Sequence, residues 1–160
     1  MDVTTSLENG LVLSLDWEVK NVGLADLHWV VGSDGLTVHT TYLGDGLGSL
    51  MQAAVDLQLG SSATVALLQA EPAATWFIFS GATDEVYVQI VQFDDVQSED
   101  RRWSGGISRW RGRVEVAGLI SAVRRMAEEA LARAGSLDRY QRNWGGIPFP
   151  SEKLAALQQA

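Results

Sequence analysis

The 160-residue chain has no cysteine and only two histidines, His28 and His39. Without cysteine there can be no disulfide bond, no thiolate metal site and no cysteine nucleophile. Apolar runs are short: no window reaches the ~18 consecutive apolar residues that a transmembrane helix needs. The polar, acidic start MDVTTSLENG lacks the basic and then apolar order of a signal peptide. We expect a single globular domain over residues 1–160 in the cytoplasm, with no membrane partner.

Positive charge is also scarce in the first hundred residues, where Lys20 is the only basic residue against fifteen acidic ones. Residues 101–142 reverse this balance with ten arginines against four acids, and the whole chain carries a net charge of −8. One interpretation is that the two parts neutralise each other after folding. The other is that the acidic part attracts a basic protein partner. We expect no nucleic-acid partner, because affinity for DNA or RNA comes largely from neutralising phosphates.

Strict alternation of apolar and polar residues marks the first third of the chain. LVLSLDWEVK, residues 11–20, has the period of two that indicates a half-buried strand. Asn21-Val22-Gly23 suits a three-residue hairpin loop, and further strands are predicted at about 24–31 and 36–43. These segments predict a three-stranded meander with one polar face.

The remaining elements alternate between one helix and a second group of strands. A helix is predicted from an N-cap at Asp45 to a stop at Gly60. Strands follow at about 63–70, 75–80 and 85–93, and Trp76 to Phe79 place apolar residues on both faces. Such strands are covered on both sides by helices, another sheet or a second copy of the chain, so a homodimer is one expectation.

The C-terminal part is predicted to be mainly helical. Residues 93–112 are expected to form an exposed connection with a short strand near Ile107. A long helix follows up to Gly135, and a short helix begins near Ser151. The predicted fold class is therefore α+β: an antiparallel sheet of about six strands (three-stranded meander, helix, three strands) packed with one long and one short C-terminal helix.

Both histidines are candidate metal ligands. If Ser33-Asp34 form the tip of the second hairpin, His28 lies opposite His39, and the first hairpin places Asp16 opposite His28. Two imidazoles and one carboxylate are ligands that zinc or non-haem iron accepts. The competing interpretations are a solvated strand face, because metal sites usually lie in concave, dry pockets, and a pH-responsive contact. A solvated face is favoured, and with it no cofactor.

The segment RRWSGGISRWRGR (residues 101–113) interleaves arginines with two tryptophans. Three interpretations remain open: ion pairing with the acids upstream, a protein-binding site, or contacts with single-stranded nucleic acid. In the protein-binding interpretation the contact residues are Arg101, Trp103 and Trp110. The segment has no Gly-Lys-Ser/Thr ending, so it does not match a phosphate-binding P-loop.

The C-terminal helix ending ALARAG, the residues Tyr140, Trp144, Phe149 and Leu154, and the earlier stretch YLGDGLGSLMQAA carry a resemblance. Together they resemble a group of small uncharacterised bacterial α+β proteins, some of which are loosely associated with the immunity side of toxin–immunity systems. The resemblance implies a non-catalytic protein and assigns no functional residue.

The sequence offers no strained Gly-x-Ser-x-Gly turn beside a histidine, which also disfavours a hydrolase. The leading hypothesis is a soluble, non-catalytic binding protein, in its specific form an immunity-like inhibitor of a basic partner. Asp16, Glu18 and Asp26 on the polar strand face are its expected contacts. The alternative is a metal-binding domain or enzyme that uses Asp16, His28 and His39.

Overall fold

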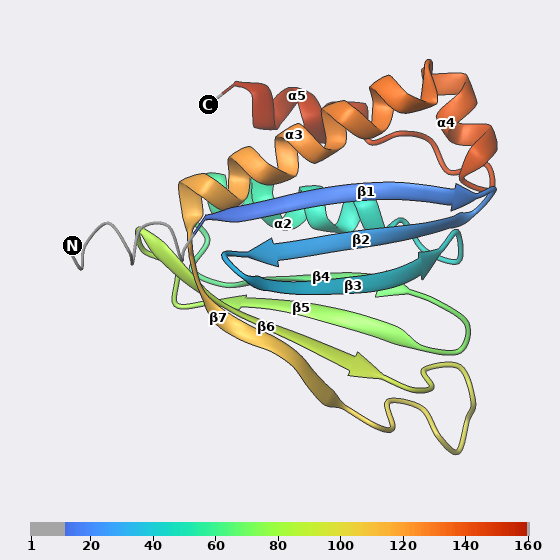
Figure 1. Ribbon diagram of the computed structural model, residues 1–160, viewed down its shortest axis with the longest axis horizontal. Helices are drawn as coiled ribbons and strands as arrows, with labels where there is room; N and C mark the ends of the chain where they lie inside the picture. The colour runs from blue at the N-terminus through green and yellow to red at the C-terminus, as the bar shows by residue number, and fades with distance from the viewer. Residues whose placement is uncertain (1–11, 160) are drawn as a thin grey trace.

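The computed structural model describes residues 12–159 and shows an α+β fold of strands and helices (Figure 1). In chain order the strands are β1 (Leu13–Asn21), β2 (Leu24–Val31), β3 (Asp34–Thr41), β4 (Thr64–Gln69), β5 (Ala74–Ser80), β6 (Glu85–Phe93) and β7 (Ile107–Glu115). The helices within the described range are α2 (Gly46–Gln58), α3 (Val116–Ala134), α4 (Leu137–Asn143) and α5 (Ser151–Gln158). The predicted fold class is confirmed at this level.

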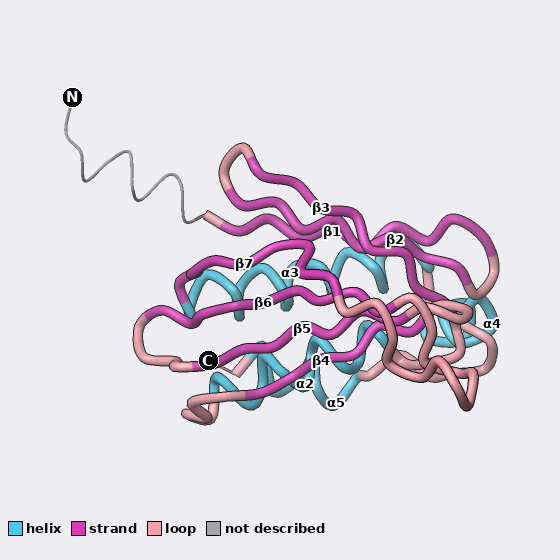
Figure 2. The backbone as a smooth tube through the Cα atoms, turned by 90° about the horizontal axis from the view of Figure 1, so that it is seen from below, coloured by secondary structure: helices cyan, strands magenta, loops and turns pink. Residues whose placement is uncertain are grey.

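The strands form two antiparallel sheets and not the single six-stranded sheet predicted from the sequence. The first sheet has the order β1-β2-β3 and the second the order β4-β5-β6-β7. Because α2 stands between β3 and β4 in the chain, the two strands do not pair as a hairpin. They are joined instead by the Thr40 hydroxyl, which donates to the Gln69 carbonyl at 2.8 Å. Figure 2 shows the second sheet in front of the helices when the molecule is viewed from below.

The first sheet follows the alternation of its sequence. Leu15 and Trp17 on β1 are buried against the helices, while Asp16 and Glu18 between and beside them point away from the core. Gly23 in the first loop has φ +75°, a left-handed conformation that glycine adopts without steric cost. Leu11, the first apolar position of the predicted strand, lies outside the described residues.

Helix α2 begins as the sequence predicts. The side chain of Asp45 accepts a hydrogen bond from the backbone N–H of Gly48 at 2.9 Å and so caps the helix. The helix packs on β4, α3 and α5 and buries Leu47, Leu50 and Met51 completely or nearly so. It therefore fills the space between the two sheets and the C-terminal helices.

The second sheet buries one of its faces and leaves the other partly exposed. Phe77 and Phe79 point into the core, whereas Trp76 and Ile78 lie on the outer face and are only half-buried. Coverage of β5 and β6 on both faces was expected, and within the described chain the inner face is buried while the outer face is covered only in part. The second copy predicted to cover the outer face stays a prediction.

Two elements of the C-terminal half differ from the sequence expectation. β7 is a nine-residue strand paired along β6, where only a short strand near Ile107 was expected. α4 was not predicted at all; its N-cap Ser136 accepts a hydrogen bond from the backbone N–H of Arg139 at 3.2 Å. None of the described helices is long and apolar enough to cross a membrane.

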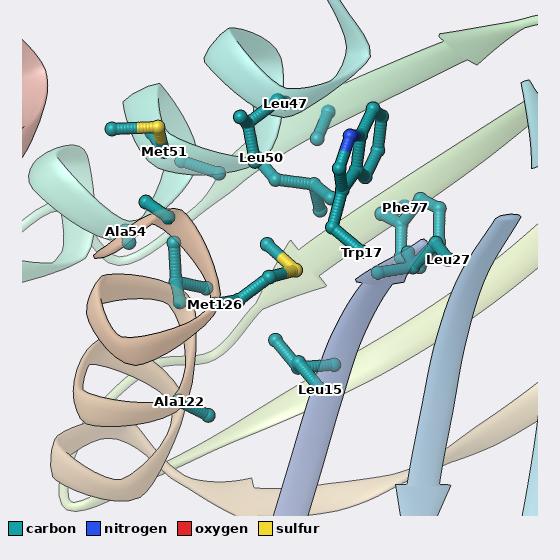
Figure 3. Packing of buried hydrophobic residues seen from close by; sticks show 14 of the residues in the cluster. Leu15, Trp17, Leu27, Leu47, Leu50, Met51, Ala54, Phe77, Ala122 and Met126 are labelled. Atoms are coloured by element: carbon teal, nitrogen blue, oxygen red, sulfur yellow. The ribbon is translucent and has the colours of Figure 1, made fainter. Parts of the chain in front are cut away.

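Large aromatic side chains join the layers of the core. Trp29 on β2 is fully buried, with its ring centroid 5.7 Å from that of Phe77 on β5 and 5.5 Å from that of Trp110 on β7. At the helical side, Trp17 makes an edge contact with Trp144 at 5.5 Å. Figure 3 shows Trp17 and Phe77 packed near leucines of α2 and Met126 of α3. Burial of such large aromatic surfaces dominates the energetics of a core.

Deprotonation of the buried Tyr140 is expected to lower the free energy of unfolding at alkaline pH. Its side chain is 2% exposed, and its hydroxyl has no hydrogen-bond partner among residues 12–159. Burial, with a smaller contribution from the charge of Asp45, raises the pKa of Tyr140 well above its usual value. Its contribution to stability is therefore intact below the unfolded pKa of about 10 and is lost as the pH rises further.

At neutral pH, we expect the free energy of unfolding of Tyr140→Phe to equal that of the parent or to exceed it by about 1 kcal/mol. The reason is that the substitution removes an unpartnered buried hydroxyl. Above about pH 10 the advantage should grow. Urea unfolding at both pH values measures this. Tyr42→Phe, at an exposed tyrosine, is the control and should show no growth in the difference.

Candidate functional site

The candidate site is the outer face of the first sheet. Its ionisable residues on β1, β2 and β3 form what we name the acid–imidazole face, which consists of Asp16, Glu18, Asp26, His28 and His39. Strand pairing arranges the face in two adjacent rows, Asp16–His28–Thr37 and Glu18–Asp26–His39. Residues facing each other in such rows have Cβ atoms about 4.5–5.5 Å apart, so these side chains contact each other.

Glu18 and His28 form the diagonal contact between the rows. The Glu18 Oε2 atom lies 2.9 Å from His28 Nε2, and His28 Nδ1 lies 3.0 Å from the Thr37 hydroxyl. The other carboxylate oxygen of Glu18 accepts a hydrogen bond from the Lys20 ammonium at 2.8 Å. The hydrogen bond from Lys20 first, and that from His28 second, holds the pKa of Glu18 below its usual value.

The other two carboxylates of the face have different partners. Asp26 binds His39 Nδ1 at 2.5 Å and is only 14% exposed. Asp16 accepts a hydrogen bond from the guanidinium of Arg133 on α3 at 2.9 Å. With neutral imidazoles, the three carboxylates, Lys20 and Arg133 leave the face with one net negative charge. The charges are thus paired locally, but by exposed cations.

Of the two pairings in the predicted row Asp16–His28–His39, the first is confirmed and the second is wrong. Asp16 does lie opposite His28, but His28 faces Thr37 and His39 faces Asp26. The turn consists of Gly32 and Ser33, with Val31 paired to Asp34 and Gly32 at φ +58°. A two-residue hairpin turn of this kind favours glycine at its first central position, and this moves the partner of His28 by two residues.

Glu18 takes the place that the sequence interpretation gave to His39. One ligand atom each from Asp16, Glu18 and His28 can be chosen so that all three lie within 4.8 Å of one another. The signal was present in the sequence, because Glu18 is two residues from Asp16 on the same strand face. What the pattern could not reveal is that the long Glu18 side chain reaches diagonally to His28.

The tryptophans of the arginine–tryptophan segment lie away from this face, whereas Arg109 lines one cavity together with Thr37 and His39. Trp103 is 42% exposed, has φ +62° and stacks on Trp76 with ring centroids 5.8 Å apart, on the outer side of the second sheet. Trp110 points inward and contacts Trp29. Arg101 is exposed in the loop between β6 and β7. The six residues predicted to contact a partner therefore do not form one surface.

The arginines of this segment also do not form the ion pairs that one interpretation expects. Within residues 12–159, no acidic side chain lies within ion-pair distance of any arginine between 101 and 113. Arg109 donates instead to the Gln92 side chain at 2.7 Å. Among residues 12–159, the ion pair that joins the acidic first hundred residues to the later arginines is Asp16–Arg133.

The acid–imidazole face is open to solvent. The side chains of Asp16, Glu18 and His28 are 39%, 42% and 32% exposed. Asp16 also lines a cavity of about 490 Å³ between β1 and α3, and His39 and Thr37 line another of about 340 Å³. His28 lines neither of them. Substrate sites are usually concave and largely apolar, whereas the contact between Glu18 and His28 is polar and partly exposed.

Comparison with known proteins adds no assignment. No protein-family model, curated protein or solved structure matches the chain. The resemblance to bacterial immunity-type proteins remains an expectation from the sequence.

Proposed function

We propose that the chain is a non-catalytic protein-binding domain that accepts a basic protein partner on the acid–imidazole face, as an immunity-type inhibitor does. The observation that carries this proposal is the convergence of Asp16, Glu18 and Asp26 on neighbouring positions of one exposed sheet face. Asp16 and Glu18 are the more accessible of the three and are the expected primary contacts.

The existing ion pairs leave the carboxylates available. Lys20 and Arg133 are 49% and 56% exposed, and an exposed ion pair contributes only about 0–1 kcal/mol. An arginine or lysine of a partner can therefore replace either cation at little cost. In the drier environment of an interface, the same contacts would be stronger.

The charge layout favours the encounter with a basic protein. The first hundred residues carry fifteen acidic side chains and one lysine, and the arginines that could offset them are concentrated after residue 100. Complementary charge mainly raises the association rate and selects against partners of the same sign. Such an effect must weaken as salt is added.

We expect the double variant Asp16→Asn/Glu18→Gln to bind a basic partner about tenfold more weakly than the parent. The measurement is affinity capture on the immobilised protein at about 0.1 M and about 1 M salt, with the amount of each captured protein determined separately. Across this range the screening length falls from about 10 Å to about 3 Å, so parental capture should fall as well.

The matched control is Glu99→Gln/Asp100→Asn, which removes the same charge from two exposed residues of the β6–β7 loop. A true partner is retained by this control and lost by the face variant. If no captured protein separates the two variants, or if capture is indifferent to salt, the proposal is wrong.

A further inference from the structure

We propose that Asp16, Glu18 and His28 form a binding site for a divalent transition-metal ion of the zinc class. Their ligand atoms lie within 4.8 Å of one another. Two carboxylate oxygens and one imidazole nitrogen are a ligand set that zinc accepts, and zinc with three protein ligands completes its coordination with water. The proposal shares two carboxylates with the proposed function but does not depend on a partner.

The backbone supplies the spacing. Asp16 and Glu18 are two residues apart on β1 and so share one face, and His28 lies opposite Asp16 on β2. Ligand atoms around a tetrahedral zinc ion are separated by about 3.3 Å, given bond lengths of about 2.0–2.1 Å. Side-chain shifts of about 1 Å are therefore enough, with the ligands anchored on paired strands and not on a loop.

Thr37 gives His28 the orientation that a metal ligand needs. Without a metal, the Nε2–H of His28 donates to Glu18 Oε2 at 2.9 Å, and Nδ1 accepts from the Thr37 hydroxyl at 3.0 Å. The same hydroxyl can instead accept a proton carried by Nδ1, which frees the lone pair of Nε2. A metal ion at Nε2 would then take the place of the Nε2 proton, and metal-bound histidines typically hold their second nitrogen in this way.

The cations now on the carboxylates are replaceable. Lys20 and Arg133 are about half exposed and are held by surface ion pairs. His39 provides a contrast on the same face, since its Nδ1 is engaged by Asp26 and it lies outside the three-ligand group. The two histidines of the chain therefore divide into one predicted ligand and one predicted bystander.

The test is a calorimetric titration of the purified protein with Zn²⁺ alone. We expect one site, weakened at least about 100-fold in His28→Ala and about tenfold in Thr37→Val, which loses only the orienting hydroxyl. His39→Ala, the matched control, should change the affinity less than about twofold. Zn²⁺ should also raise the midpoint of thermal unfolding in the parent and in His39→Ala, but not in His28→Ala.

Replacement of zinc by Co²⁺ gives a second readout, because the visible absorption of bound Co²⁺ reports nitrogen and oxygen coordination and should disappear in Glu18→Gln. Equal weakening by His28→Ala and His39→Ala would indicate nonspecific surface imidazoles and overturn the proposal, as would a titration without one-to-one binding. Because the titration contains no partner protein, failure of the proposed function would leave its outcome unchanged.

Discussion

Replacing Trp29 by alanine is expected to lower the free energy of unfolding by about 3–5 kcal/mol. The indole is fully buried and contacts Phe77 and Trp110, which belong to different strands of the second sheet. Among the described residues no main-chain ladder joins the two sheets, so contacts between side chains such as these hold their inner faces together. A domain of ordinary stability, about 5–15 kcal/mol, would be left marginal.

The measurement is urea unfolding followed by circular dichroism. Trp103→Ala is the matched control, because it removes an indole that is 42% exposed and should cost less than about 1 kcal/mol. Trp29→Phe should cost clearly less than Trp29→Ala, since it retains an aromatic ring and removes a buried N–H that lacks a partner among the described residues. Equal costs for Trp29→Ala and Trp103→Ala would refute the assigned role of Trp29.

Local patterns predicted the first sheet well. The alternation of residues 13–19 is as predicted, and Asp16 pairs with His28 as expected. The loop is Val22-Gly23 and not the predicted Asn21-Val22-Gly23, because Asn21 pairs with Leu24, and an irregularity between Val19 and Asn21 restores the expected register. The second hairpin was misplaced because Gly-Ser-Asp-Gly offers two adjacent turn positions. The chain turns at Gly32-Ser33 and not at Ser33-Asp34, and that one-residue difference moves every facing pair by two.

Two elements that the sequence analysis missed, most of β7 and all of α4, had weak signals in the sequence. Trp110, Gly112 and Val114 alternate with polar residues along β7, but the arginines between them made the segment resemble an exposed connection. Ser136 and the acidic Asp138 mark the start of α4, yet the glycines and proline that follow suggested only turns. The division into two sheets depends on contacts between distant segments, which no local period encodes.

The candidate site could also be predicted only in part from local sequence patterns. Strand alternation was enough to place Asp16, Glu18 and His28 on one face, because Cβ direction follows from the backbone. The contact between Glu18 and His28 depends on side-chain rotamers and on the register of β2 with β3. The face could therefore be predicted from the sequence, but its three-ligand group could not.

Gly145→Ala is expected to destabilise the protein by about 2–4 kcal/mol, the second large effect. Gly145 has φ +62°, and a Cβ atom there would lie 2.6 Å from Cδ2 and 3.0 Å from Cβ of Tyr42. The left-handed conformation costs an L-residue about 1–2 kcal/mol, and overpacking adds about 1–3 kcal/mol. The Tyr42 ring cannot simply rotate away, because its own Cβ is among the atoms approached.

Tyr42 lies between the segment that follows α4 and the loops of the first sheet, and it packs against Gly145. On its other side Tyr42 packs against Gly23, whose N–H donates to the Asn143 carbonyl at 2.7 Å. The indole N–H of Trp144 donates to the Gly44 carbonyl at 3.3 Å. A shift of Tyr42 would therefore loosen the β1–β2 loop and the end of α4 together.

Gly146→Ala separates backbone strain from steric overlap. Gly146 also has a positive φ, +89°, but apart from its chain neighbours no atom of the described residues lies within 4 Å of an added Cβ, so we expect only the strain of about 1–2 kcal/mol. In a Tyr42→Ala background, the cost of Gly145→Ala should fall to the same level, because the overlapping ring is gone. If the cost is unchanged by Tyr42→Ala, the steric explanation fails and only the backbone conformation opposes the substitution.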